Sequence, residues 1–216
     1  MDLPEATALL VIDVQRAEVM PGDHGVPIMP GGASRHARIL DLVVGARHVG
    51  VPVIFVQEVH KRTLIDFGRE LDGVEGIHCL EGDPGTELAE GLDPGEDEYV
   101  IRKRRYSAFF ATELELVLKS LGTRTLILVG ALTDVCVHYT FADAHQHDYR
   151  CLVVTDCVGG SSLEAHESAL RAMAYLQAGC RVDSAAVLAA LSGQASVPAA
   201  SAIAAREVPR AAAVRA

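Results

Sequence analysis

The chain alternates short apolar runs, rich in β-branched residues, with longer segments in which apolar residues recur at helical spacing. The run from Ala8 to Ile12 is apolar without a break, which is typical of a strand buried on both faces of a sheet. Strands are expected at residues 7–14, 52–57, 98–101, 125–129, 151–155 and 181–183. Helices are expected at residues 33–49, 112–121, 135–148, 163–178 and 185–191. This alternation predicts an α/β fold of three layers, α/β/α, with a mainly parallel central sheet.

Two connecting segments are long. Residues 21–32 form a loop rich in Gly and Pro, and residues 58–96 contain only one plausible short helix, near 86–91. A stretch as long as the second one usually lines a site or an interface in a compact domain. We therefore expect it to cover part of the active site.

The end of the chain differs in composition from the rest. Residues 192–216 are rich in Ala, Ser, Pro and Arg, with few large apolar side chains to offset the entropy lost on ordering. A length of 216 residues suits one compact domain. We expect that domain to span residues 1–191 and residues 192–216 to form a flexible tail without an assigned function.

Charge and cysteine content limit the partners and the compartment. Lys and Arg total 19 against 29 Asp and Glu, a net charge of −10, which argues against nucleic acid and anionic membranes as partners. Aromatic residues make up 5% and Trp is absent, so we expect a small substrate. The five cysteines lack C-x-x-C spacing, and the acidic first residues do not resemble a signal peptide. These features predict a cytoplasmic protein whose partners are a small molecule and copies of itself.

Three polar residues follow the ends of expected strands. Asp13 ends the first strand, Lys103 follows the third, and Cys136 lies in the turn after the fourth. Ligands of an open parallel sheet bind outside the carboxyl ends of its strands. The three side chains are therefore expected to meet at one rim of the sheet, although they are far apart in sequence.

The residue types at this rim suit nucleophilic catalysis. Cys136 is expected in the first turn of a helix, where free N–H groups and the helix dipole favour a thiolate and can bind an oxyanion. Lowering its pKa from ~8.5 by about 1.5 would ionise roughly half of the thiol at neutral pH. Asp13 suits a general base, and Lys103 suits a cation that stabilises negative charge. Taken singly, each has a structural alternative: a small buried side chain, a turn cap and a solvated lysine.

Three motifs in this order make residues 7–190 resemble the isochorismatase-like cysteine hydrolases, the family of nicotinamidase, N-carbamoylsarcosine amidase, ureidoacrylate amidase and biuret hydrolase. The motifs are Leu10-Val11-Ile12-Asp13-Val14-Gln15, Lys103-Arg104-Arg105-Tyr106-Ser107-Ala108-Phe109 and Gly130-Ala131-Leu132-Thr133-Asp134-Val135-Cys136-Val137. The resemblance implies the isochorismatase-like hydrolase fold and a homodimer or homotetramer.

The resemblance also implies a role for each motif. Asp13 would be the base, Lys103 the stabilising cation and Cys136 the nucleophile that forms an acyl enzyme. A cis peptide bond would join Ala131 to Leu132, and the N–H groups of Leu132 and Cys136 would form the oxyanion hole. Family members that hydrolyse the vinyl ether of isochorismate lack this cysteine, so its presence favours hydrolysis of a C–N bond.

A degraded set of metal ligands lies in the long loop. Glu58, His60, Asp66 and His78 stand where nicotinamidases carry Asp-x-His, a second His and a third His. Two imidazoles and two carboxylates suit Zn²⁺, Mn²⁺ or Fe²⁺ in principle. Glu-x-His with an Asp six residues later also resembles the metal-free, biuret-hydrolase-like branch. We therefore expect no metal and no cofactor, with Glu58 and His60 shaping the pocket or an interface.

Further pocket residues are expected beside the motifs. Arg105, Tyr106 and Phe109 are candidates for the pocket wall, with ordinary packing as the alternative for the two aromatic residues. Gln15 is a candidate to bind a substrate amide, or else to satisfy the backbone of the first loop.

The leading hypothesis is a cysteine-dependent amidohydrolase acting on a small amide, carbamoyl or ureido compound. The alternatives are a metal-assisted deamidase of the nicotinamidase type and a non-catalytic binding subunit with the same fold.

Overall fold

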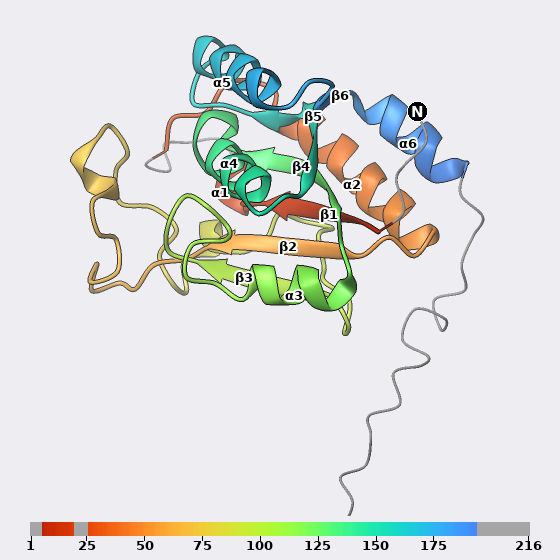
Figure 1. The fold of residues 1–216 in the computed structure, drawn as a ribbon. Coiled ribbons are helices and arrows are strands. Elements are labelled where there is room, and N and C mark those ends of the chain that lie inside the picture. The colour runs from red at the N-terminus through yellow and green to blue at the C-terminus, as the bar shows by residue number, and fades with distance from the viewer. Residues whose placement is uncertain (1–5, 20–25, 194–216) are drawn as a thin grey trace, which may run out of the picture.

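The computed structural model describes residues 6–19 and 26–193 (Figure 1). The predicted tail therefore falls outside the described residues, apart from its first two positions. Six strands form one sheet: β1 (Thr7–Ile12), β2 (Val53–Glu58), β3 (Tyr99–Lys103), β4 (Thr125–Ala131), β5 (Arg150–Gly159) and β6 (Arg181–Val182). Their order is β3-β2-β1-β4-β5-β6, and every pair is parallel, which confirms the predicted α/β class.

Helices cover both faces of this sheet. They are α1 (Arg16–Val19), α2 (Gly32–His48), α3 (Leu114–Leu121), α4 (His138–Gln146), α5 (Leu163–Leu176) and α6 (Ser184–Ser192). Alternate residues of β1 face opposite layers, because successive side chains of a strand point to opposite faces. Leu10 belongs to the core beneath α3, α4 and α5, whereas Leu9 belongs to the core beneath α2 and α6. No helix among the described residues is long and apolar enough to span a bilayer.

The carboxyl ends of β1, β2 and β3 point to the left in Figure 1, toward the long connection between β2 and β3. That connection contains two short 3-10 turns, Glu70–Asp72 and Pro84–Thr86. The helix expected near residues 86–91 is absent from the described structure. Its backbone pairs instead with the loop after β1, through Arg16 N to Glu87 O (2.8 Å) and Ala89 N to Val14 O (3.0 Å). The long loop is therefore attached to the end of β1.

Strand β5 extends to Gly159, four residues beyond the expected end. A register irregularity between Leu128 and Gly130 of β4 lets the pairing resume at Gly130 with Val158. Gly130 also lies against β1: a Cβ at this position would fall 1.9 Å from the carbonyl oxygen of Ile12, and its φ is +114°. Only a residue without a side chain allows β1 and β4 to approach this closely next to the site.

We predict that Gly130→Ala lowers the free energy of unfolding by at least about 3 kcal/mol, because backbone strain adds to overpacking against Ile12. Gly122→Ala is the matched control, since Gly122 also has a positive φ, of +68°, but an added Cβ there meets no atom within 4 Å. The control is expected to lose only about 1 kcal/mol. Urea denaturation followed by circular dichroism measures both values, and equal losses would contradict the close-approach argument.

Candidate active site

Strand register brings the predicted residues together. Glu58 ends β2 and is the register partner of Lys103, which ends β3. Asp13 follows β1, and its N–H donates to Val56 O of β2 at 2.9 Å. The turn with Cys136 follows β4, whose Gly130 pairs with Ile12. Four chain segments thus deliver their polar residues to the same end of the sheet.

Lys103 lies at the centre of this group and is completely buried. Its Nζ lies 2.9 Å from Asp13 Oδ2 and also donates to Glu58 Oε2. The same ammonium donates to Cys136 Sγ at 3.3 Å. The Cys136 thiol lies 3.6 Å from Glu58 Oε2. The predicted convergence of Asp13, Lys103 and Cys136 is thus present, and Glu58 adds a second carboxylate to Lys103 that was not predicted.

Burial and these charges set the protonation states. Burial raises the pKa of Asp13 to about 6, with Lys103 acting in the opposite direction. Burial would lower the pKa of Lys103, but Asp13, Cys136 and Glu58 hold it well above its usual value. At neutral pH the arrangement is an ammonium between two carboxylates.

The state of Cys136 differs from the expectation. Burial raises the pKa of its thiol well above the usual range; Lys103 lowers it, and the carboxylates of Asp13 and Glu58 raise it further. Burial and, after it, the two neighbouring carboxylates therefore keep the resting sulfur protonated at neutral pH, and not half ionised as expected. The resting nucleophile is a thiol that has an ionised carboxylate within reach.

The turn that carries Cys136 is tied to the loop after β5. It is a π-helical turn, Thr133–Val137, that leads directly into α4. Asp134 accepts hydrogen bonds from the N–H and the hydroxyl of Ser161, at 2.8 and 2.6 Å. The peptide bond that joins Ala131 to Leu132 before this turn is cis.

A cavity of about 670 Å³, including its opening to solvent, lies above these residues. Asp13, Glu58 and Cys136 line it. Ala131, Leu132, Val135 and Tyr106 contribute further wall, so both proposed oxyanion-hole residues and one of the predicted aromatic residues reach the cavity. Cys79, Ala17, Val26 and Ile28 also line it.

Gln15 lines the cavity, but its side-chain amide already makes hydrogen bonds to the backbone. Its Nε2 donates to Thr86 O at 2.7 Å and to Glu58 O at 3.0 Å, and its Oε1 accepts from Glu58 N at 3.1 Å. These bonds join the loop after β1 to the end of β2. Gln15 therefore serves the backbone, as one alternative proposed, but that of the end of β2 and of the long loop rather than that of the first loop.

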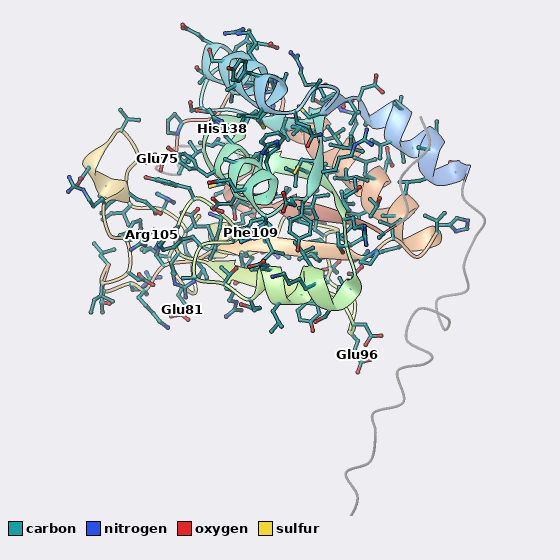
Figure 2. All side chains as sticks on the ribbon, viewed as in Figure 1. Glu75, Glu81, Glu96, Arg105, Phe109 and His138 are labelled. Atoms are coloured by element: carbon teal, nitrogen blue, oxygen red, sulfur yellow. The ribbon has the colours of Figure 1, made fainter. Side chains whose placement is uncertain are left out.

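Three other predicted pocket residues are not among those lining the cavity. Arg105 donates to Asp66 O at 2.6 Å, and Figure 2 shows it near the long loop. The ring of Phe109 stacks on His147, which directly follows α4, with the ring centroids 5.2 Å apart. His60 is buried beneath the cavity and stacks on Phe67 at 3.9 Å.

His60 belongs to a buried cluster with Glu58, His78 and Glu70. Glu58 Oε1 lies 2.9 Å from His78 Nε2 and 3.1 Å from His60 Nε2. Glu70 Oε2 lies 3.2 Å from the same His60 nitrogen. Burial would lower the pKa of His60, but the two carboxylates raise it to about 9. A proton on His60 thus balances the charge of this cluster.

The cluster corrects the predicted ligand set in one position. Asp66 was one of the four residues that could hold a metal in principle; its Oδ1 lies 3.8 Å from His60 Nδ1, but its carboxylate accepts from Arg104 Nε at 2.8 Å and from Lys61 N at 2.9 Å. Its place is taken by Glu70, on a 3-10 turn in a segment without readable period. Both Asp66 and Glu70 lie close in sequence to the buried Phe67, and the sequence alone does not show which of the two carboxylates turns inward.

The cluster fits a divalent cation. One donor atom from each of Glu58, His60, Glu70 and His78 lies within 4.8 Å of the others. Both Glu70 carboxylate oxygens are buried and without a hydrogen-bond partner. Two imidazoles and two carboxylates form a donor set suited to Zn²⁺, Mn²⁺ or Fe²⁺.

Two acidic residues of the cavity were not predicted. Glu18, on α1, and Glu75, in the long loop, both line it. Glu18 lies five residues beyond Asp13, within reach of the same strand end. That spacing is the one signal that the sequence offers for it.

Comparison with known proteins places this site in a family. Residues 7–186 match the model of the isochorismatase domain. A probable inactive nicotinamidase of Arabidopsis thaliana is 36% identical over 74% of this chain and 84% of its own. The maleamate amidohydrolase of Pseudomonas putida is 32% identical over 76% of each chain. The ureidoacrylate amidohydrolase RutB of Methylobacterium radiotolerans is 29% identical over 77% of this chain and 72% of its own.

Solved structures agree with these matches. An isochorismatase-like hydrolase from Alkaliphilus metalliredigens superposes with a TM-score of 0.74 and 28% identity, covering 85% of this chain and 98% of its own. The pyrazinamidase of Pyrococcus horikoshii in complex with zinc gives a TM-score of 0.72 and 29% identity, covering 82% of this chain and 99% of its own. The chain belongs to the isochorismatase-like hydrolase family.

Proposed function

We propose that this protein is a cysteine-dependent amidohydrolase that cleaves a C–N bond of a small amide, carbamoyl or ureido compound and releases ammonia or an amine. The observation that carries the proposal is the buried Lys103 ammonium, 2.9 Å from Asp13 and 3.3 Å from Cys136, two residues that line a cavity. Amidohydrolases among the relatives support the reaction class.

Asp13 is the general base of the first half-reaction. Its carboxylate takes the proton of the Cys136 thiol, and the sulfur atom attacks the amide carbon. Lys103 stabilises the thiolate while it exists, since its Nζ already donates to Sγ. The negative charge that develops on the carbonyl oxygen is bound by the N–H groups of Leu132 and Cys136.

Collapse of this intermediate breaks the C–N bond. The proton held by Asp13 passes to the leaving nitrogen, so that ammonia or an amine departs and a thioester remains on Cys136. Asp13 then takes a proton from water, the resulting hydroxide attacks the thioester carbon, and the acid is released. The proton returns to the sulfur atom and restores the resting thiol.

A metal-assisted deamidase is the second candidate, favoured by the buried donors of Glu58, His60, Glu70 and His78. A divalent cation held by these residues would polarise or orient a substrate. A non-catalytic subunit is the third candidate, because the Arabidopsis relative is named as inactive. Assembly as a homodimer or homotetramer and a cytoplasmic location stay predictions from the sequence, as does the division into a domain and a tail.

We predict that Cys136→Ala lowers kcat by at least about 10³-fold, because it removes the thiol that accepts from Lys103 Nζ and carries the acyl intermediate in the proposed mechanism. The measurement is ammonia release from nicotinamide, biuret, triuret, N-carbamoylsarcosine, ureidoacrylate-like compounds, maleamate and maleamide. Cys157→Ala is the control, since Cys157 is equally buried but lies in the core beneath α2 and α6. Full turnover by Cys136→Ala would remove the nucleophile from the mechanism.

We predict that kcat/KM falls about tenfold per pH unit below about pH 6 and levels off above about pH 7. Asp13 acts as a base only when ionised, and its pKa is about 6, so protonation removes activity as the pH falls. The check is a pH profile of kcat/KM with a substrate that does not titrate in this range. A profile that stays flat down to pH 4.5 would exclude Asp13 as the base.

We predict that protein freed of metal with a chelator keeps its kcat/KM, because the leading mechanism uses only Asp13, Lys103 and Cys136. Elemental analysis of the same sample establishes the metal content. Loss of activity on chelation and recovery with one equivalent of a divalent cation would favour the metal-assisted candidate instead.

A further inference from the structure

The cavity is lined by four carboxylates and by no lysine or arginine among the described residues. The carboxylates belong to Asp13, Glu18, Glu58 and Glu75. Lys103 lies beneath the floor, is completely buried, and does not contribute to the lining. A ligand that enters the cavity therefore meets anionic groups in its walls.

The two carboxylates at the reacting end are already paired. Asp13 and Glu58 share Lys103, and Glu58 also accepts from His78. Both carboxylates belong to the proposed catalytic machinery, and the Asp13 oxygens, which lack a hydrogen-bond partner apart from the ion pair with Lys103, are assigned to proton transfer. Recognition of the remaining part of the substrate falls to Glu18 and Glu75.

Glu18 is a buried acceptor without a donor. Its side chain is 7% exposed, and its Oε2 is buried without a hydrogen-bond partner. The nearest cation is Arg35, whose Nε lies 3.9 Å from Glu18 Oε1. The terminal nitrogens of Arg35 donate elsewhere, to Pro30 O at 2.8 Å and Met29 O at 3.2 Å. A buried carboxylate oxygen that lacks a donor favours a ligand that supplies one.

Glu75, in the long loop between β2 and β3, is a second carboxylate that lines the cavity. It is half-buried in the long loop and makes no hydrogen bond or ion pair with a described residue. Burial raises its pKa, and the neighbouring His78 acts in the opposite direction. Figure 2 shows Glu75 at the end of the molecule to which the long loop extends.

We infer that this cavity selects amides whose non-reacting end carries N–H donors, as a carboxamide, ureido or ammonium group, and disfavours amides that end in a carboxylate. Glu18 and Glu75 accept hydrogen bonds from those donors. The inference rests on the proposed amidohydrolase activity for its substrate class. It separates this protein from the relatives named for maleamate and ureidoacrylate, which are both carboxylates.

The physical reason is the environment of the incoming charge. A carboxylate at the far end of a substrate would lose hydration on entering the cavity, and no lysine or arginine among the described lining residues would replace that hydration. It would also stand near Glu18 and Glu75, which have the same charge. An amide or ammonium group in the same place satisfies both acceptors.

Maleamide and maleamate test the inference, because they share the scissile amide and differ only in carboxamide against carboxylate. Binding is measured by calorimetry with Cys136→Ala, which does not need to turn either compound over. At about pH 8, above the Glu18 pKa of about 7, we expect maleamide to bind at least about tenfold more tightly. Equal affinities, tighter binding of maleamate, or no detectable binding of either compound would overturn the inference.

Variants assign the selectivity to the two residues. Glu18→Gln and Glu75→Gln, each combined with Cys136→Ala, are expected to reduce the preference for maleamide by at least about threefold. Glu90→Gln is the matched control, because it removes one negative charge from an exposed residue that does not line the cavity. Thermal melts check that each variant folds, and an unchanged preference in both cavity variants would overturn the assignment.

Turnover of the same compounds by the wild-type protein separates this inference from the proposed function. Preferential binding of maleamide without ammonia release from any compound of the panel would support the proposed selectivity and contradict the proposed amidohydrolase activity. Ammonia release with a preference for maleamate would support the amidohydrolase activity and contradict the proposed selectivity.

Discussion

The buried ammonium of Lys103 is the interaction on which the rest of the site depends. It is fully enclosed and is held between Asp13 and Glu58, while its third neighbour is the sulfur atom of Cys136. Removing one partner from a buried, paired charge costs about 3–5 kcal/mol, because the remaining charge is left uncompensated. Lys103 therefore holds two carboxylates side by side that would otherwise repel each other, and it keeps Asp13 ionised next to a thiol.

Glu58 connects Lys103 to the buried histidine cluster. One of its oxygens faces Lys103, and the other accepts from His60 and His78. The histidine cluster is thus continuous with the catalytic centre through a single carboxylate. Protons on the imidazoles and a divalent cation are two ways of balancing the same buried negative charge.

The backbone of the sheet sets the positions of these side chains. The register of Glu58 with Lys103 and the approach of Gly130 to Ile12 set where the ends of four strands lie. The long loop is then fixed by Gln15, whose amide bonds to the backbone of Glu58 and Thr86. The acidic walls of the cavity come from the segments attached in this way, so the contacts that build the catalytic site also help to place Glu75 and Glu18 in its walls.

The sequence by itself determined the sheet, its helices and the meeting of Asp13, Lys103 and Cys136. Uninterrupted apolar runs identify buried parallel strands, and parallel strands end at one edge, so residues just beyond them converge whatever their separation in sequence. Only the tertiary structure decided that Glu70, and not Asp66, completes the donor cluster with Glu58, His60 and His78. It also decided that Gln15 serves the backbone, and that Arg105 and Phe109 lie outside the cavity lining. Those residues lie in loops or at their edges, where no periodicity states which side chain turns inward. The protonation of Cys136 was also beyond the sequence, because burial and the two neighbouring carboxylates, which raise its pKa, exist only once the chain is folded.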